Sequence, residues 1–381
     1  MLTCFTREES PVTSTRTISG PISGPISGRT RRAAAAVTVA LLALGLTACG
    51  GSDDSSSDTS GSGDAGGGIT VHLGYFPNVT HATALVGIEK GYFATELQKD
   101  DDKVQFQQFD SGSDTIEALA SGSLDATYIG PAPALTAYQQ THGGVRIIAG
   151  AASGGASLVV SSDIKTVADL QDKTIASPGA ANTQDIAVRY YLKTKGFKTD
   201  QEGGGDVHIL PQDNSITVQA FQQGQIDGAW VPEPYASILV NEGGHVLIDE
   251  ASLWPQGRFV TTQLLVNKSF LDEHPDEVVD LLTAHVEAND FINKSPDEAK
   301  TLVNKKLEEL TQSTIPTDVF DSAWSKLTFT NDPIASSLIE VDKHAEELGL
   351  LDPVDNLSGI YDLDPLNQIL ADKGESEVSS S

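Results

Sequence analysis

The chain has 381 residues, of which 53 are acidic and 24 are Lys or Arg, and a formal net charge of −29 at pH 7. So acidic a surface argues against nucleic acid and anionic membrane patches as partners. The only cysteines are Cys4 and Cys49. The chain beyond them therefore has no thiol for a disulfide, a cysteine metal site or a nucleophile.

Residues 1–48 have the pattern of an export signal. A basic cluster at 29–32 precedes residues 33–46, which are almost wholly apolar, and this order is typical of a secretory signal. The apolar run is shorter than the roughly 20 residues that span a bilayer. It ends in Leu-Thr-Ala-Cys at residues 46–49, which resembles a bacterial lipobox. We therefore predict a lipoprotein signal over 1–48 and lipidation of Cys49; the alternative is an ordinary signal peptide with an unrelated Cys.

Residues 49–68 are almost only Gly, Ser, Asp, Ala and Thr. Such a segment cannot bury apolar surface, so we predict a flexible tether to the membrane. Loss of residues 1–48 removes five arginines and two glutamates, which moves the net charge from −29 to −32. The predicted location is the extracytoplasmic face of the cell membrane, with the lipid at Cys49 as the anchor.

The body of the chain alternates strand-like and helix-like segments. Residues 82–97 and 113–121 have helical patterns, the second with Ser113 as a plausible N-cap, and nearly all of the chain from Pro275 onward reads as helix. Strand patterns occupy residues 69–75, 103–109, 126–129, 145–149, 157–160, 174–176 and 207–210. This alternation predicts an α/β fold with mostly parallel sheets.

An internal repeat divides the body. Residues 113–129 (SDTIEALASGSLDATYI) and 215–231 (SITVQAFQQGQIDGAWV) align at a constant offset, and each copy reads as a helix, a Gly stop, a turn and a strand. The identical pairs are Ser113/Ser215, Thr115/Thr217, Ala118/Ala220, Gly122/Gly224 and Asp125/Asp227. We interpret the repeat as two similar α/β lobes; the alternative is that unrelated α/β units share this order of elements.

Two similar lobes imply a cleft between them. Residues 157–170 and 263–278 both read as a strand, a polar turn and the start of a helix, and we expect the chain to cross between lobes near them. Ligands of open α/β sheets bind beyond the carboxyl ends of the strands, and hinge motion closes two facing lobes. The predicted organisation is 69–160 for the first part of lobe 1, 161–251 for lobe 2, 252–350 for the return to lobe 1 and the C-terminal helices, and 351–381 for a partly disordered extension.

Several motifs of the body resemble those of the substrate-binding proteins of the nitrate, sulfonate and taurine transporter family. They lie at residues 74–78, 87–93, 109–114, 122–131, 167–170 and 230–235. The resemblance implies a bilobed, periplasmic-binding-protein-like fold of type II, a ligand in the cleft and delivery to the permease of an ABC importer. It also implies a monomer without a cofactor. Sulfonate or taurine is the leading ligand; nitrate, bicarbonate and a thiamine or riboflavin precursor stay open.

Most candidate ligand-binding residues follow strands and begin helices. Free backbone N–H groups at helix N-termini favour an anion, although capping alone also explains such residue types. These candidates are Asn78, Thr80, His81, Ser111, Gly112, Ser113, Gly130, Pro131, Ala132, Gly179, Asn182 and Thr183.

Three larger side chains complete the predicted site. Trp230 reads either as an apolar wall of the cleft or as a core residue. Glu233 would select a ligand with a cationic end if it faced the cleft, and would be a surface charge or a permease contact if it faced outward. Arg258 is a candidate counter-charge for an anion.

Enzymatic and metal-dependent functions are not favoured. The eight histidines have no spacing typical of metal ligands, and no metal site is predicted. Related pyrimidine-forming enzymes depend on a cysteine-rich iron motif that the body lacks, and no triad spacing is evident. We therefore predict a binding protein and not an enzyme.

Overall fold

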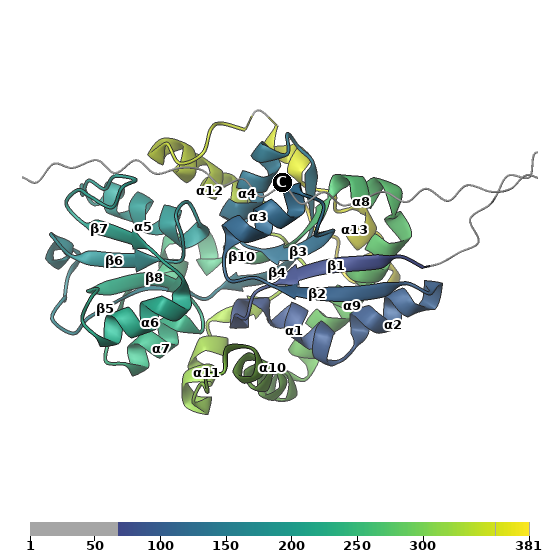
Figure 1. Ribbon diagram of the computed structural model, residues 1–381, viewed down its shortest axis with the longest axis horizontal. Helices are drawn as coiled ribbons and strands as arrows, with labels where there is room; N and C mark the ends of the chain where they lie inside the picture. The colour runs from purple at the N-terminus through teal and green to yellow at the C-terminus, as the bar shows by residue number, and fades with distance from the viewer. Residues whose placement is uncertain (1–67, 355, 381) are drawn as a thin grey trace, which may run out of the picture. The chain divides into compact units, whose positions relative to one another are not determined.

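Two β-sheets organise the protein, as the computed structural model shows for residues 68–354 and 356–380 (Figure 1). The strand order is β11-β4-β10-β3-β1-β2 in the first sheet and β7-β6-β8-β5-β9 in the second. The predicted lipoprotein signal, Cys49 and nearly all of the predicted tether lie outside the described residues. Within the described ranges, no helix is long and apolar enough to cross a membrane.

The first lobe is built on the six-stranded sheet. Its strands are β1 (Thr70–Tyr75), β2 (Lys103–Gln108), β3 (Ala126–Ile129), β4 (Val145–Gly154), β10 (Val260–Asn267) and β11 (Leu327–Phe329). One face packs on α1 (Ala82–Glu89), α2 (Tyr92–Leu97), α9 (Pro275–Lys294), α10 (Pro296–Thr311), α11 (Thr317–Trp324) and α13 (Asp364–Asp372). The other face packs on α3 (Gly112–Ala120), α4 (Pro131–Gln140) and α12 (Ala335–Leu348).

The second lobe is built on the five-stranded sheet. Its strands are β5 (Ala156–Val160), β6 (Thr174–Ser177), β7 (His208–Pro211), β8 (Gly228–Pro232) and β9 (His245–Asp249). Helix α5 (Thr183–Thr194) covers one face, and α6 (Asn214–Gln222) and α7 (Tyr235–Asn241) cover the other. Both sheets therefore have helices on both faces, which explains why the strands β3, β4, β5, β8 and β10 are buried along nearly their whole length.

The internal repeat corresponds to equivalent units in the two lobes. Strand β3 pairs parallel with β1 and antiparallel with β10, and β8 pairs parallel with β6 and antiparallel with β5. The repeated aspartates make equivalent contacts: Asp125 Oδ2 accepts from His72 N at 2.7 Å, and Asp227 Oδ2 accepts from Thr174 N at 2.9 Å. Each carboxylate therefore fixes the start of its strand against the neighbouring parallel strand.

The chain enters the second lobe earlier than expected. Strand β5 pairs with β8 and β9 in the second sheet, so the crossing lies at Gly154 and Gly155 instead of after residue 160. Both glycines have positive φ, 83° and 70°, which other residues rarely adopt. The return crossing runs through the short helices η4 (Glu250–Leu253) and η5 (Pro255–Gly257) to β10.

Local details also differ from the expectations. The helix expected over 82–97 is broken by Gly91, whose φ is 71°, into α1 and α2. Ser111, not Ser113, caps α3, because the Ser111 side chain accepts a hydrogen bond from Asp114 N. The C-terminal extension was expected to be partly disordered, but α13 packs on α9 and buries Leu366 and Leu370 in the core of the first lobe.

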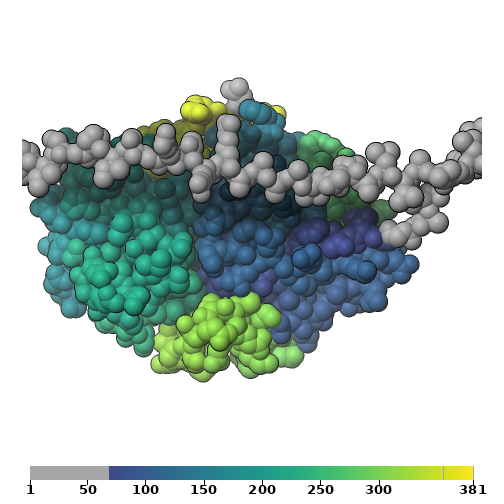
Figure 2. Space-filling model, viewed as in Figure 1, coloured from purple at the N-terminus to yellow at the C-terminus, as the bar shows by residue number. Residues whose placement is uncertain are grey.

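C-terminal helices join the two lobes outside the crossings. Helix α12 packs on the first sheet and also contacts α5 of the second lobe. In the space-filling view, the surface of α10 and α11 lies between the teal second lobe and the blue first lobe (Figure 2); α10 contacts α1, and α11 contacts α7. The two lobes are therefore held against each other on both faces of the sheets.

Candidate functional site

A small cavity lies between the lobes, where β1, β3, β6 and β8 end. Its volume is about 50 Å³, and we call it the central cavity. It is lined by Phe76, Asn78, Thr80, His81, Asp110, Ser111, Gly112, Gly130, Pro133, Pro178, Asn182, Thr183, Gln184, Asn214, Pro232, Thr261 and Thr262. The lining comes from both lobes, as expected for a cleft between two open sheets.

Several helices begin at the central cavity. The N-cap residues of η1 (Val79–His81), α3, α4 and α5 are Asn78, Ser111, Gly130 and Asn182, and all four line it. The first residue of α6, Asn214, does so as well. Helix N-termini carry partial positive charge and unpaired N–H groups. The lining residues include no Lys or Arg, and Asp110, which also lines the adjoining cavity, is the one acidic residue among them. The helix N-termini therefore favour an anion held by neutral donors, away from Asp110.

His81 is a neutral hydrogen-bonding group of the cavity. Its side chain is buried, and burial lowers its pKa from 6.5 to about 3. The ring stacks on Phe76, with centroids 4.8 Å apart, and Nδ1 accepts from Phe76 N at 3.3 Å. Because a neutral imidazole has one acceptor and one donor nitrogen, Nε2 carries the proton. His81 can therefore donate a hydrogen bond to an anion without adding charge.

The lobes touch across the cavity through small residues and one hydroxyl. Ala132 N, at the start of α4, donates to Thr183 Oγ1, at the start of α5, over 3.3 Å. A Cβ on Gly130 would lie 2.8 Å from Thr183 Oγ1, and one on Gly112 would lie 2.8 Å from Asn182 Oδ1. Both glycines are therefore needed for this close approach of the lobes, which is the physical reason for Gly at these positions.

Eight of the predicted residues line the central cavity: Asn78, Thr80, His81, Ser111, Gly112, Gly130, Asn182 and Thr183. Three others lie beside it. Pro131 and Ala132 are buried in the first turn of α4, and Gly179 is next to Asn182. Ser113 is exposed and does not line the cavity, because Ser111 takes the N-cap position of α3 that was expected for Ser113.

Trp230 is a core residue and does not line a cavity wall. Its indole is fully buried in the second lobe, where it packs on Tyr191 with ring centroids 5.6 Å apart. Nε1 donates to Glu250 Oε2 at 2.6 Å. The predicted contact of Trp230 with ligand is therefore corrected, since β8 directs this side chain toward α5 and away from the cleft.

Glu233 is buried in an ion pair and does not line the central cavity. Its oxygens accept from Lys326 Nζ at 2.8 Å, Ser237 N at 2.9 Å and Ser237 Oγ at 3.0 Å. Arg258 is also engaged elsewhere: it is half exposed and pairs with Asp332 at 2.7 Å. Both predicted charges therefore have protein partners, and neither lines the central cavity.

Sequence reasoning missed several lining residues of the second lobe. Pro178, Asn214 and Pro232 line the cavity, and the buried Oδ1 of Asn214 has no hydrogen-bond partner. The internal repeat contained the signal for them, because they are the counterparts of Phe76, Gly112 and Gly130 at the offset that relates Asp125 to Asp227. Extending the repeat beyond 113–129 would have identified Asn214 and Pro232, because their counterparts Gly112 and Gly130 were predicted site residues.

A second, acidic cavity of about 570 Å³ adjoins the central one on the side of α10 and α11. The two share Phe76, Asn78, Asp110 and Asn214. The charged residues that line it are Asp110, Asp213 and Glu242, and its lining contains no Lys, Arg or His. Desolvation, followed by the charges of Asp110 and Asp213, raises the pKa of Tyr235 at this cavity to about 12. This acidic antechamber suits a cationic group.

The profile of the NMT1-like family matches residues 65–305. The chain belongs to the NMT1-like family. The predicted family resemblance is thereby confirmed.

This NMT1-like chain is also similar to individual binding proteins. It is 31% identical over 195 residues to the taurine-binding periplasmic protein of Escherichia coli, a match that covers 51% of this chain and 59% of that protein. The chain thus matches less than two thirds of that relative.

Solved structures share the fold of this NMT1-like chain. The periplasmic nitrate-binding protein NrtA from Synechocystis PCC 6803 superposes with a TM-score of 0.68 at 17% identity, over 80% of this chain and 89% of that one. The alkanesulfonate-binding protein SsuA from Xanthomonas axonopodis pv. citri gives 0.65 at 17% identity, over 77% and 98%. The predicted bilobed α/β fold is therefore confirmed. The sheets are mixed and not mostly parallel as expected, because β4, β5, β9, β10 and β11 pair antiparallel with their neighbours.

In the described part of this NMT1-like chain, no group of three or more His, Cys, Asp or Glu side chains is arranged to hold a metal ion. The side chains of His81 and His285 are buried and neutral, because desolvation lowers their pKa values to about 3 and about 4.

Proposed function

We propose that this chain is the substrate-binding protein of an ABC importer, and that its ligand is a small aminosulfonate of the taurine type. The observation that carries the proposal is the polarity of the cleft. Helix N-termini and the His81 donor surround the central cavity, Asp110 lines both cavities where they meet, and Asp213 and Glu242 line the antechamber. A sulfonate in the first and an ammonium in the second would each meet complementary groups.

The similarity to a taurine-binding protein supports the same ligand class. The ligand would be handed to the permease subunits, and the protein would act by binding, without a catalytic step. Closure around the ligand would use the contact of Thr183 with the start of α4, because this contact joins the lobes directly above the central cavity.

The test is calorimetric titration of the purified chain with taurine and with ethanesulfonate, which lacks the ammonium group. Taurine should bind at least tenfold tighter, because only taurine has a charge complementary to Asp110. Asp110→Asn should reduce this preference to less than threefold, whereas the exposed control Asp276→Asn should leave it unchanged. Equal affinities for both sulfonates in the native chain would refute the aminosulfonate assignment.

Nitrate or bicarbonate is a second candidate, favoured by one observation. The central cavity, at about 50 Å³, has room for a small oxyanion without any use of the antechamber. In that case nitrate or bicarbonate should raise the melting temperature of the chain by mass action, taurine should not, and Asp110→Asn should not weaken binding of the anion.

We also propose that Cys49 is lipidated and anchors the protein to the extracytoplasmic face of the membrane, with the protein acting as a monomer. The lipobox-like run before Cys49 supports this. Cys49→Ser should move the protein from the membrane fraction to the soluble extracytoplasmic fraction, while the control Cys4→Ser should not. Membrane association that survives Cys49→Ser would contradict lipid anchoring at this residue.

A further inference from the structure

A third cavity is separate from the central cavity. Its volume is about 640 Å³, and its walls come from α5, the return crossing η4–η5 and α12. We call it the α5–α12 groove. It shares only Thr183 with the central cavity and nothing with the acidic antechamber. Its volume lies within the range that small-molecule sites occupy.

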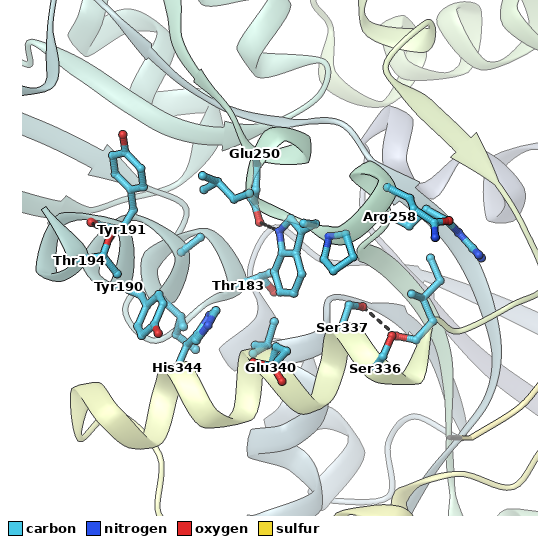
Figure 3. Close-up of a pocket in the computed structure, with 18 residues that line it drawn as sticks. Thr183, Tyr190, Tyr191, Thr194, Glu250, Arg258, Ser336, Ser337, Glu340 and His344 are labelled. Carbon is cyan, nitrogen blue, oxygen red and sulfur yellow. Dashed lines mark hydrogen bonds between the residues drawn. The ribbon is translucent and has the colours of Figure 1, made fainter.

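Aromatic rings form the walls of the α5–α12 groove. Tyr190 of α5 and His344 of α12 stack with centroids 3.5 Å apart, and Figure 3 shows them side by side. The Trp254 ring lies 6.1 Å from His344 and stacks on Phe259 at 5.6 Å. Ile186, Leu253, Ile334 and Val341 add apolar surface. Such a lining matches sites for flat aromatic molecules.

The Trp254 ring, which forms one wall of the groove, is held in place by a buried carboxyl group. Glu250 is 2% exposed, and it accepts from Trp254 Nε1 at 3.3 Å and from Trp230 Nε1 at 2.6 Å. The dashed line at Glu250 in Figure 3 marks the bond to the Trp254 indole. A ring fixed in this way loses little conformational freedom when a ligand stacks on it, so the site is pre-organised.

The charged groups of the groove all have protein partners. Arg258 pairs with Asp332 at 2.7 Å, and Glu340 pairs with Lys343 at 2.6 Å. Glu250 is bonded to the two indoles. Desolvation lowers the pKa of His344, which keeps its ring neutral at pH 7. An ionic ligand would therefore have to compete with existing ion pairs, whereas an uncharged ligand would not.

We propose that the α5–α12 groove is a second ligand site, which binds a planar, uncharged aromatic molecule between the lobes. Helix α5 and Glu250 belong to the second lobe, whereas α12 is anchored in the first by Leu338, Val341 and the bond from Val260 N to Ser337 Oγ. The walls meet only when the lobes are together. A ligand in the groove therefore stabilises the closed arrangement, as a regulator of the cleft.

The decisive experiment is calorimetric titration of the purified full chain with lumichrome, a neutral tricyclic aromatic probe. A ligand of this size should bind with a Kd on the order of 0.1 mM. Ala187→Trp, which fills the groove from α5, and Ser336→Trp, which fills it from α12, should each weaken binding at least tenfold. Ala94→Trp, on an exposed position of α2, is the matched control and should bind lumichrome as the native chain does.

Two results would overturn the proposal. One is that the native chain does not bind lumichrome at 1 mM. The other is that Ala187→Trp and Ser336→Trp both bind lumichrome as tightly as the native chain while their melting temperatures stay close to native. A further arm rests on the proposed function: saturation with taurine should tighten lumichrome binding about fivefold or more, because both ligands favour closure. If taurine does not bind at all, the proposed ligand fails, while the direct titration still decides the groove.

Discussion

Replacement of Lys326 by Met tests how firmly the buried Glu233 is tied to its ion pair. Glu233 is completely buried, whereas the Lys326 side chain is 29% exposed. Removal of one partner of a buried pair costs about 3 to 5 kcal/mol, because the other charge stays buried without compensation. The partial exposure of Lys326 and the two Ser237 donors reduce the penalty. We expect Lys326→Met to lower the free energy of unfolding by about 2 to 3 kcal/mol.

Urea denaturation followed by circular dichroism measures this loss, and a fall in melting temperature of roughly 4 to 10 °C should accompany it. Lys305→Met is the matched control, because Lys305 is 74% exposed and its pair with Glu309 lies on the surface; it should cost less than about 0.5 kcal/mol. Addition of Glu233→Gln to Lys326→Met should restore part of the stability, since an amide removes the buried charge. If Lys326→Met costs no more than Lys305→Met, the Glu233 carboxylate is not held as described.

Three further predictions concern pH and the repeat. Desolvation raises the pKa of Glu250 from 4.5 to about 7. The folded state therefore binds more protons than the unfolded state between these pH values, and the free energy of unfolding should fall as pH rises through 7. In urea titrations, Glu250→Gln should remove a decline on the order of 3 kcal/mol between pH 5 and 8, and an unchanged decline would exclude Glu250 as its source. Because the pKa of His81 is about 3, taurine affinity should change less than twofold between pH 5 and 8 in calorimetry, and a steep loss above pH 6 would mean that His81 binds as a cation. The last prediction concerns the repeated aspartates. The free energy of unfolding should fall by about 2 kcal/mol in Asp125→Ala and in Asp227→Ala, because each variant loses the hydrogen bond to a strand N–H. A large difference between the two variants in urea denaturation would contradict the equivalence of these contacts.

The class of fold and part of the cleft were accessible from the sequence because they depend on local patterns. Helix starts, glycine turns and buried strands repeat in 113–129 and 215–231, and parallel strands bring their carboxyl ends to one edge of a sheet. Residues placed by these turns, such as His81, Gly112 and Thr183, therefore line the central cavity as predicted from their positions.

The remaining features depend on partners far away in the chain. Glu233 meets Lys326 across 93 positions, and Trp230 meets Glu250 across 20; no local pattern identifies either partner. The boundary at Gly154 was missed because residues 145–160 read as a nearly continuous run of small and apolar residues, all but one of those described being buried. Only the pairing of β5 with β8 and β9 shows that residues 156–160 belong to the second lobe.

The two crossings make the second lobe an insertion within a hairpin of the first. Strands β4 and β10 are antiparallel neighbours, with Ser153 opposite Val260, and β5 and β9 are antiparallel neighbours, with Ser157 opposite Asp249. The ends of residues 156–249 therefore lie side by side, and so do the ends of the chain that they interrupt. A short turn between β4 and β10 would join the two parts of the first lobe into one continuous chain. The second lobe could then be removed as a single segment. The topology thus allows the second lobe to be exchanged as a cassette without any new path for the chain of the first.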